Sequence, residues 1–428
     1  MAIKFKNANV LDKNFDVLKD NDLIVEGNRI KTIRPTLAND DAHYDRVIDC
    51  NGNYLIPGIK NSHTHNAMVF LRSISDDLPL LDWLNKYCFP NEAKLTYEDI
   101  YYFTLLGIME NLSSGVVGSM DMYLDLFAMA DASIKSGYRI NICDTIQKFN
   151  KRIAPEENYI EFNNYKGDNG NLVKYTYGIH AEYTNTKEII QTIADLVHKY
   201  KVPFFTHNAE SQREVDECKE RWGGLTPTQV FEEFGLFEYG GGGYHCVHLE
   251  DKDMDIFKKH DVIAVTCPGS NVKLSSGIPP IKKFLDKGIR VAIGTDGPAS
   301  NNAIDMFREM YLTTTLQKVS TNDPSVLPPK EILKMVMVNG AACLGHTDGD
   351  VIEEGKLADI VMIDVNKPNM QPLNTFINNL IYSATKTNVK LTMVDGKVLY
   401  EDGKFYINED ENYIYKKCNE LLKNLLAR

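Results

Sequence analysis

Short β-rich runs alternate with turns at both ends of the chain. Residues 1–57 contain LIVEGNRIKTI and RVIDCNGNYLIPG, and the chain ends with GKLADIVMIDVNK and VKLTMVDGKVLYEDGKF. Such runs, separated by Asp-Gly turns, are typical of antiparallel strands. We expect residues 1–57 and 351–408 to fold together as a small β-sandwich domain, followed by a C-terminal helix over 409–428.

The middle of the chain has a different pattern, in which short apolar runs alternate with stretches of helical period. The apolar runs include VVGSMDMY, YTYGIHAEY, VPFFTHNAE, YHCVHLE, VIAVTCPGS and RVAIGTDG, and the helical stretches include TKEIIQTIADLVHKY and PIKKFLDKG. Strand–helix alternation over residues 58–350 indicates an α/β fold, either a (β/α)8 TIM-type barrel or a large doubly wound sheet.

Polar residues of metal-binding type stand at the C-terminal ends of these predicted strands. They are His63 with His65, His180, His207 with Glu210, His245, and Asp296. In a barrel these ends converge on one mouth, whereas in an open sheet they would be spread along an edge. The pattern therefore favours the (β/α)8 barrel as the catalytic domain.

The stretch PGIKNSHTHNAM places His63 and His65 two residues apart at a predicted strand end. Residues i and i+2 of a strand share a face, so both imidazoles can reach one ion. Each signal has an ordinary structural alternative: His248 competes with His245 for any role, and Asp296 precedes Gly297 as in a plain turn. The signals taken together predict a metal site.

Composition excludes several classes of function. The net charge of −12 provides no basic field for a phosphate backbone, so we expect no nucleic-acid partner. No run approaches the roughly 18 apolar residues of a spanning helix, and the first residues lack a signal-peptide core, which predicts a cytoplasmic protein without a membrane partner. Eight cysteines without a C-x-x-C pair indicate reduced thiols, so a metal would need histidine and carboxylate ligands.

Four motifs carry a family resemblance. PGIKNSHTHNAM, THNAE, HCVHL and GTDGPASNN, in this order, resemble the amidohydrolase superfamily. Two longer stretches, DDLPLLDWLNKYCFPNEAKLT and PGSNVKLSSGIPPIKKFLDKGIRVAIGTDGPASNN, resemble the branch that deaminates 5'-methylthioadenosine and S-adenosylhomocysteine. The resemblance spans nearly the whole chain and also implies a homo-oligomer.

The resemblance assigns roles to particular residues. It implies that one divalent ion, usually zinc and alternatively iron, is bound by His63, His65, His207 and Asp296. It assigns proton chemistry to Glu210 and His245, and substrate contact to Trp83, Glu92, His180 and Glu210. The fourth strand, YTYGIHAEY, offers no lysine of the kind that bridges two metals in other members, so a single ion is expected.

The chemistry of the residues agrees with these roles. Three imidazoles and one carboxylate leave a position for water, whose pKa a divalent cation lowers toward about 7. His245 can stabilise this water, Asp296 can accept its proton, and Glu210 can protonate N1 of a purine. Attack at C6 followed by loss of the amine would release ammonia.

Two substrate-contact residues have both a functional and a structural interpretation. Trp83 can supply a flat apolar wall for a purine or thioalkyl group, or it can be a core residue beside Leu80 and Leu84. Glu92 can accept hydrogen bonds from both ribose hydroxyls, or it can be a solvated residue at a helix start.

The stretch YRINICDTIQKFNKRIAPEE departs from the branch at the positions that reach the tail of the substrate. Asp144 stands where an arginine is expected, and Arg152 is the only arginine that remains available. The sequence therefore predicts a deaminase of methylthioadenosine, 5'-deoxyadenosine or adenosine rather than of S-adenosylhomocysteine.

Two other classes of function stay open at this point. One is a deaminase of a free base such as guanine or cytosine, or a triazine-type chlorohydrolase or cyclic amide hydrolase on the same scaffold. The other is a catalytically silent metal-binding protein, which the presence of Glu210 and His245 disfavours.

Overall fold

Eight parallel strands form the central sheet of the computed structural model, which describes residues 1–74, 76–78, 80–148, 155–164 and 172–428. Each strand pairs with its sequence neighbour, in the order β13-β12-β11-β10-β9-β8-β7-β6. The strands are β6 (Ile59–Thr64), β7 (Val116–Tyr123), β8 (Arg139–Asp144), β9 (Val173–Ile179), β10 (Phe204–Asn208), β11 (Gly241–His245), β12 (Val262–Thr266) and β13 (Val291–Ile293).

The first and last strands of this sheet meet and close it into a barrel. The Asp296 amide, just beyond β13, donates to the carbonyl of His63 in β6 at 3.0 Å. The Asn61 side chain bonds Thr295 twice, accepting from its amide at 3.0 Å and donating to its hydroxyl at 2.8 Å. This closure confirms the predicted barrel and rejects the open doubly wound sheet.

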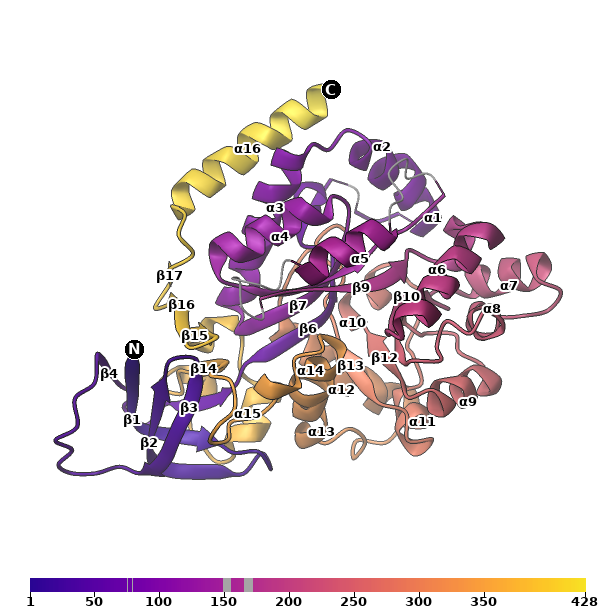
Figure 1. Cartoon of the computed structure of the whole chain (residues 1–428). Helices are drawn as coiled ribbons and strands as arrows, with labels where there is room; N and C mark the ends of the chain where they lie inside the picture. The colour runs from indigo at the N-terminus through magenta and orange to yellow at the C-terminus, as the bar shows by residue number, and fades with distance from the viewer. Residues whose placement is uncertain (75, 79, 149–154, 165–171) are drawn as a thin grey trace.

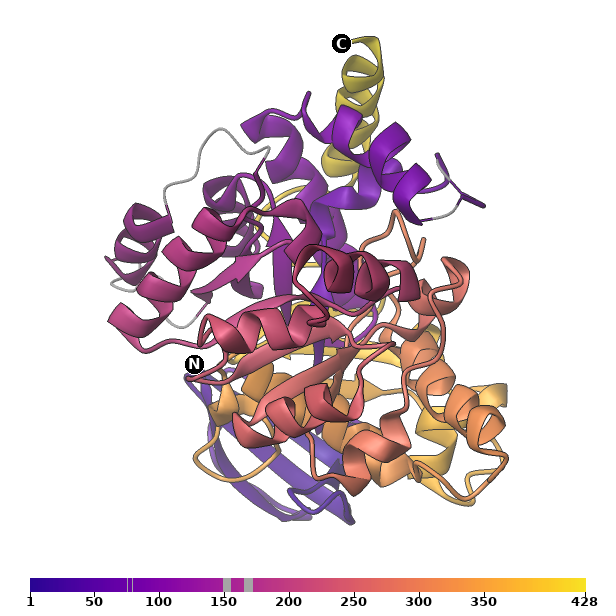
Figure 2. The same ribbon diagram turned by 90° about the vertical axis from the view of Figure 1, so that its right-hand side faces the viewer.

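Helices cover the outside of the barrel (Figures 1 and 2). Helix α6 shows why: Thr186 caps its N-terminus, and Ile190, Ile193 and Val197 form the buried stripe that the sequence pattern predicts. The described helices of the barrel region are α1 (Leu80–Trp83), α2 (Phe89–Glu92), α3 (Tyr97–Ser113), α4 (Leu126–Ser136), α5 (Pro155–Asn164), α6 (Lys187–Tyr200), α7 (Gln212–Arg221), α8 (Pro227–Glu233), α9 (Asp251–Lys259), α10 (Pro268–Lys273), α11 (Ile281–Asp286), α12 (Met306–Thr321), α13 (Pro329–Lys334) and α14 (Gly340–Cys343).

The interior of the barrel is filled by side chains, as in other small barrels. Phe205, Tyr244 and Val265 belong to a compact apolar cluster with two methionines of β7, a cysteine of β8 and a cysteine of α14. This cluster lies below the strand ends that carry the polar residues, so it forms the floor of the site.

A second sheet contains strands from both ends of the chain, as predicted (Figure 1). Its order is β17-β16-β15-β14-β5-β1-β2-β3, and β4 pairs with β1. The strands are β1 (Ala2–Leu11), β2 (Val17–Glu26), β3 (Arg29–Pro35), β4 (Arg46–Asp49), β5 (Tyr54–Pro57), β14 (Ile360–Ile363), β15 (Val389–Val394), β16 (Lys397–Glu401) and β17 (Lys404–Phe405). The two ends join where β14 pairs antiparallel with β5.

Helices α15 (Phe376–Tyr382) and α16 (Glu411–Ala427) complete the chain. Helix α16 buries Ile414, Cys418, Leu421 and Leu425 on one side and contacts α3. The domain limits at 57/58, 350/351 and 408/409 stay a prediction. No helix in the described part of the chain is both long enough and apolar enough to cross a bilayer.

Candidate metal centre and active site

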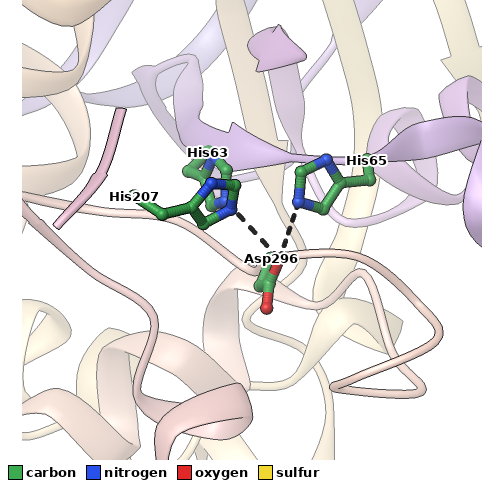
Figure 3. A group of neighbouring side chains, drawn as sticks. All are labelled: His63, His65, His207 and Asp296. Carbon is green, nitrogen blue, oxygen red and sulfur yellow. Dashed lines mark ion pairs between the residues drawn. The ribbon is translucent and has the colours of Figure 1, made fainter. Parts of the chain in front are cut away.

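Four side chains with metal-binding atoms converge at the C-terminal mouth of the barrel (Figure 3). His63 and His65 come from β6 and the turn after it, His207 comes from β10, and Asp296 follows β13. One ligand atom from each lies within 4.8 Å of all the others. The Nε2 atoms of His63 and His65 lie 3.5 Å and 3.2 Å from Asp296 Oδ1. Residues 233 positions apart in sequence thus share one site.

Hydrogen bonds to backbone carbonyls orient two of the imidazoles. His65 Nδ1 donates to the carbonyl of Met122, and His207 Nδ1 donates to the carbonyl of His180 at 2.6 Å. A proton on Nδ1 leaves Nε2 with a free lone pair, which is the usual arrangement of a metal-binding histidine.

Asp296 is held by its own set of contacts. Its Oδ2 accepts hydrogen bonds from the hydroxyls of Ser270 at 2.6 Å and Ser300 at 2.7 Å, while Oδ1 points toward the histidines. Its backbone has φ of 59°, a left-handed conformation that is uncommon outside glycine and often found at functional sites. Although burial opposes ionisation, the neighbouring imidazoles of His63 and His65 keep the pKa of Asp296 well below its usual value.

The residues fit a divalent ion. Both ring nitrogens of His63 are buried and have no hydrogen-bond partner among the described residues, which costs about 1–3 kcal/mol for an unpaired group. Burial lowers the pKa of His63 to about 3, so the ring is neutral, as a metal ligand must be. Three imidazoles with one carboxylate match the nitrogen and oxygen ligands that zinc accepts.

Glu210 and His245 lie beside this cluster. His245 Nε2 is 3.8 Å from Glu210 Oε2, and its Nδ1 is 2.7 Å from Asn271 Oδ1. The Glu214 carboxylate accepts the amides of Ala209 at 3.1 Å and Glu210 at 2.8 Å, so it fixes the turn that presents Glu210. Glu210 and His245 are both buried, and burial raises the pKa of Glu210.

A pocket with about 590 Å³ of empty space, part of it open to solvent, lies over these groups. The residues lining it are His65, Met68, Leu80, Trp83, Leu84, Phe89, Glu92, Met122, Tyr123, Leu124, Thr145, Gln147, His180, Tyr183, His207, Glu210, His245, Leu274 and Asp296. It therefore brings the predicted substrate-contact residues Trp83, Glu92 and His180 together with the candidate catalytic groups.

Two other residues considered in the sequence lie outside the pocket. Asp144 is buried, accepts the Tyr175 hydroxyl at 2.8 Å and is absent from the described pocket lining, so the predicted repulsion of a substrate carboxylate by Asp144 is not supported. His248 Nε2 is 2.8 Å from the Ser276 carbonyl and does not line the pocket, which leaves His245 as the histidine of this strand end. Arg152 lies outside the described residues.

The comparison with protein families agrees with this geometry: the model of the amidohydrolase family matches residues 54–399. The chain belongs to the amidohydrolase family. This amidohydrolase is 38% identical to the 5-methylthioadenosine/S-adenosylhomocysteine deaminase of Caldanaerobacter subterraneus, over 100% of this chain and 99% of that protein. It is 35% identical to the 5'-deoxyadenosine deaminase of Methanosarcina acetivorans, again over 100% and 99% of the two chains.

A solved structure is similar to this amidohydrolase over its whole length. The structure of an adenosine deaminase from Xanthomonas campestris, determined with bound zinc, matches with a TM-score of 0.92 and 27% identity. The match covers 100% of this chain and 98% of that one.

Sequence reasoning missed several residues of the site. Tyr244 stacks on the ring of His63, with ring centroids 3.7 Å apart and planes 21° from parallel. Tyr123 and Gln147 line the pocket, and Ser270 holds Asp296. The sequence showed only that these residues stand at or just beyond strand ends. Many polar and aromatic residues of a barrel occupy such positions, so position did not identify them.

Gly294 gives a test of the packing under the metal ligands. A Cβ atom at this position would lie 2.6 Å from the backbone nitrogen and 2.7 Å from the carbonyl oxygen of His63. We expect Gly294→Ala to displace His63, to lower bound metal well below one equivalent, and to destabilise the fold by about 1–3 kcal/mol, as overpacking does. Metal analysis and thermal unfolding measure the two effects.

Gly178→Ala is the matched control for this substitution. Its added Cβ would crowd the barrel wall to a similar degree, 2.5 Å from Cys143 Sγ, and its three nearest atoms belong to none of the candidate metal ligands. It should lose stability and retain its metal. A Gly294→Ala protein that binds a full equivalent of metal as tightly as wild type would contradict the expectation.

Proposed function

We propose that this amidohydrolase is a metal-dependent hydrolytic deaminase of an adenosine derivative, which converts the 6-amino group to 6-oxo and releases ammonia. The observation that carries the proposal is the placement of Glu210 and His245 beside the candidate metal ligands, in a pocket that also contains Glu92. The deaminase names of its relatives support the same reaction class.

We propose His63, His65, His207 and Asp296 as the ligands of one divalent ion, and zinc as that ion. The three nitrogens and one oxygen suit zinc, and the similar adenosine deaminase was determined with bound zinc. When bound, such an ion lowers the pKa of a water toward about 7 and so supplies the nucleophile at neutral pH.

His245 and Asp296 act on the water in this proposal. Burial opposes protonation of His245, but the carboxylates of Glu210 and Asp296 outweigh it and raise the pKa of the imidazole. A protonated Nε2 can hold the attacking oxygen by a charge-assisted hydrogen bond. Asp296, ionised and fixed by two serine hydroxyls, is placed to accept the proton that the water loses.

Glu210 acts on the purine ring. Burial raises the pKa of Glu210, which favours the protonated carboxyl that gives its proton to N1 as C6 is attacked. The Ser276 hydroxyl donates to Glu210 Oε1 at 3.4 Å, and the Glu214 carboxylate fixes the backbone of Glu210, so the proton donor is held in place. Proton delivery to the amine then releases ammonia.

The pocket favours a nucleoside with an uncharged 5' group. The described lining residues include no lysine or arginine that could pair with the homocysteine carboxylate. Apolar side chains of Leu80, Leu84 and Leu274 line it together with Trp83. We therefore propose methylthioadenosine, 5'-deoxyadenosine or adenosine as substrates ahead of S-adenosylhomocysteine.

An ammonia-release screen of the metal-replete protein tests the function. The screen should include adenosine, methylthioadenosine, 5'-deoxyadenosine and S-adenosylhomocysteine, with adenine, guanine and cytosine as free bases. Turnover of the adenine nucleosides, with little turnover of free bases, is the expected result. A preference for guanine or cytosine would replace the proposal by a free-base deaminase, and absence of turnover on every compound would remove the deaminase function.

Glu92 provides a second test of the proposal that the substrate is a nucleoside. If its carboxylate accepts both ribose hydroxyls, each charge-assisted bond contributes about 1.5–3 kcal/mol. Glu92→Gln should then reduce kcat/KM for adenosine by about 10-fold to 100-fold and leave any activity on free adenine almost unchanged. Steady-state kinetics on the two substrates measure the difference.

Glu98→Gln is the control, because Glu98 is an exposed glutamate of α3 paired with Lys417 and does not line the pocket. It should leave both activities at the wild-type level. Equal losses of kcat/KM on adenosine and adenine in the Glu92 variant would show that Glu92 supports the fold of the site and does not bind the ribose.

A further inference from the structure

Three loops at the mouth of the barrel are joined by one ring of polar contacts. Lys273 Nζ donates to Asp76 Oδ1 at 2.6 Å and to the amide oxygen of Asn302. Asn302 Nδ2 donates in turn to Asp76 Oδ2 at 3.2 Å. An ammonium can only donate and a carboxylate can only accept, so the amide of Asn302 has the one orientation that satisfies both partners. We call these three residues the rim triad.

The members of the rim triad follow three neighbouring strands. Asp76 lies after β6, Lys273 ends α10 after β12, and Asn302 lies after β13. Strand β12 pairs with β13, and the chain just beyond β13 bonds β6 where the barrel closes. The rim triad therefore holds loops together across the closure of the barrel.

The first of these loops leads into one wall of the pocket. Asp76 stands just before α1, and residues 80–92 contribute to the pocket lining Leu80, Trp83, Leu84, Phe89 and Glu92. Two side-chain bonds within this segment are local: Lys86 donates to Asp82, and Asn91 donates to the carbonyl of Tyr87. Local bonds shape the segment but do not fix it to the barrel, whereas the contacts of Asp76 do.

Lys273 belongs to a helix that is fixed to the candidate active site. Ser270 of α10 donates to Asp296 at 2.6 Å, and Asn271 Oδ1 lies 2.7 Å from His245 Nδ1. The rim triad thus connects the wall formed by residues 80–92 to a helix that contacts the candidate metal centre. None of its members lines the pocket, so any effect on substrate must act through the residues that they hold.

The backbone around the rim triad adopts uncommon conformations. Ser73, Asp77 and Asn302 have φ of 62°, 62° and 68°, in the left-handed region that residues other than glycine seldom occupy. Such conformations persist where surrounding contacts hold them, often at functional sites. The conformation of these loops therefore depends on contacts such as those of the rim triad.

We propose that Lys273 and Asp76 are positioning residues, whose ion pair holds residues 80–92 where Trp83 and Glu92 meet the nucleoside. This inference rests on the proposed nucleoside deaminase function and adds to it a pair that does not touch the substrate. The two side chains are 25% and 33% exposed. Ion pairs of this kind add little to overall stability, so loss of the pair should change the pocket without unfolding the protein.

Lys273→Met tests the proposal, because methionine keeps an unbranched apolar side chain and removes the charge. The KM for adenosine should rise by about 2-fold to 5-fold, the range expected for a partly exposed ion pair. The kcat, the metal content and the melting temperature should stay close to the wild-type values. Hydrogen exchange of the backbone amides of residues 80–92 should become faster, and this measurement does not depend on activity.

Reversal of the two charges separates the ion pair from the shape of the side chains. Lys273→Asp should raise KM more than Lys273→Met, because two carboxylates then face each other and repel. Asp76→Lys combined with Lys273→Asp restores a pair of opposite charges, and the Asn302 amide can turn over to serve both partners. The double variant should return KM toward the wild-type value, a rescue that two merely structural side chains would not give.

Lys282→Met is the matched control. Lys282 pairs with Asp286 at the same distance of 2.6 Å, but both residues stand on α11 and neither lines the pocket. The control should leave the KM for adenosine and the exchange of residues 80–92 unchanged.

The outcomes separate this inference from the function on which it rests. An unchanged KM or unchanged exchange in Lys273→Met, or a double variant no better than Lys273→Asp, would overturn the positioning role while wild-type deamination of adenosine stands. A wild-type protein that deaminates no adenine nucleoside would overturn the proposed function and, with it, the role of the pair in placing a nucleoside. A raised KM with faster exchange, both reversed in the double variant, is the result that supports the proposal.

Discussion

Replacing His63 or Asp296 with alanine should leave the protein with far less than one equivalent of bound metal and with no measurable deaminase turnover. Each substitution removes one atom of a set of four candidate ligand atoms that lie within 4.8 Å of one another. Three remaining ligands bind a divalent ion much more weakly, and without the ion no water reaches a pKa near about 7. Metal analysis after dialysis, combined with an ammonia assay, measures both losses.

The alanine variants can also change packing, and a third variant, Asp296→Asn, separates this effect from the loss of charge. His63 is fully buried and stacks on Tyr244, so His63→Ala leaves a cavity and should also lower thermal stability. Asp296→Asn keeps the shape of the side chain and its contacts with Ser270 and Ser300, so it isolates the loss of charge from the loss of packing.

His248→Ala is the control for both variants, because His248 is a histidine of the same barrel face that is bonded to the Ser276 carbonyl and does not line the pocket. It should retain the metal and the activity. A full equivalent of tightly bound metal in both His63→Ala and Asp296→Ala would contradict the ligand assignment.

Replacing Glu210 with glutamine should separate proton transfer from metal binding. Glu210 is not a member of the four-residue ligand cluster, and a glutamine of the same size can still accept the Ser276 hydroxyl. The variant should therefore keep its metal and its fold. It should lose at least about 100-fold in kcat, because general acid–base groups contribute about 10²–10⁴-fold.

Glu217→Gln is the control, since Glu217 lies on α7, the helix that follows Glu210, is partly exposed and pairs with Arg213 at the surface. It should leave the kinetics unchanged. Near-normal turnover in Glu210→Gln would show that Glu210 is not the proton donor. Loss of the metal in this variant would indicate that Glu210 is a metal ligand instead.

Local sequence patterns predicted the elements because they depend on neighbours along the chain. The apolar run VVGSMDMY corresponds to β7 at Val116–Tyr123, and the helical stretch TKEIIQTIADLVHKY corresponds to α6 at Lys187–Tyr200. The sequence interpretation counted YTYGIHAEY as the fourth strand without naming the run that forms the third, and the structure shows that Arg139–Asp144 forms that strand, β8. Period and residue type identify an element, but they do not state which strands pair.

The candidate ligands were predictable for a related reason. In a parallel barrel every strand runs in the same direction, so a polar residue at the C-terminal end of any strand is brought to the same mouth. The positions of His63, His207 and Asp296 at predicted strand ends were sufficient to place them together before any distance was known.

Side-chain orientation at the mouth was not predictable in this way. Asp144 ends β8, and the sequence placed it against the substrate, yet its carboxylate accepts the Tyr175 hydroxyl and lies outside the described pocket lining. Tyr123 also ends its strand, and it lines the pocket without a partner. Which of two successive strand-end residues faces the pocket depends on the tilt and pairing of neighbouring strands.

The sequence by itself determined the succession of strands and helices, the family, and the residue types available at the strand ends, because these follow from local periodicity and from motifs. Only the tertiary structure decided the closure of β6 against β13, where Gly294 leaves room for the backbone of His63, and the stacking of Tyr244 beneath that ring. These features depend on contacts between residues far apart in the chain, and no local pattern encodes the distance between such residues.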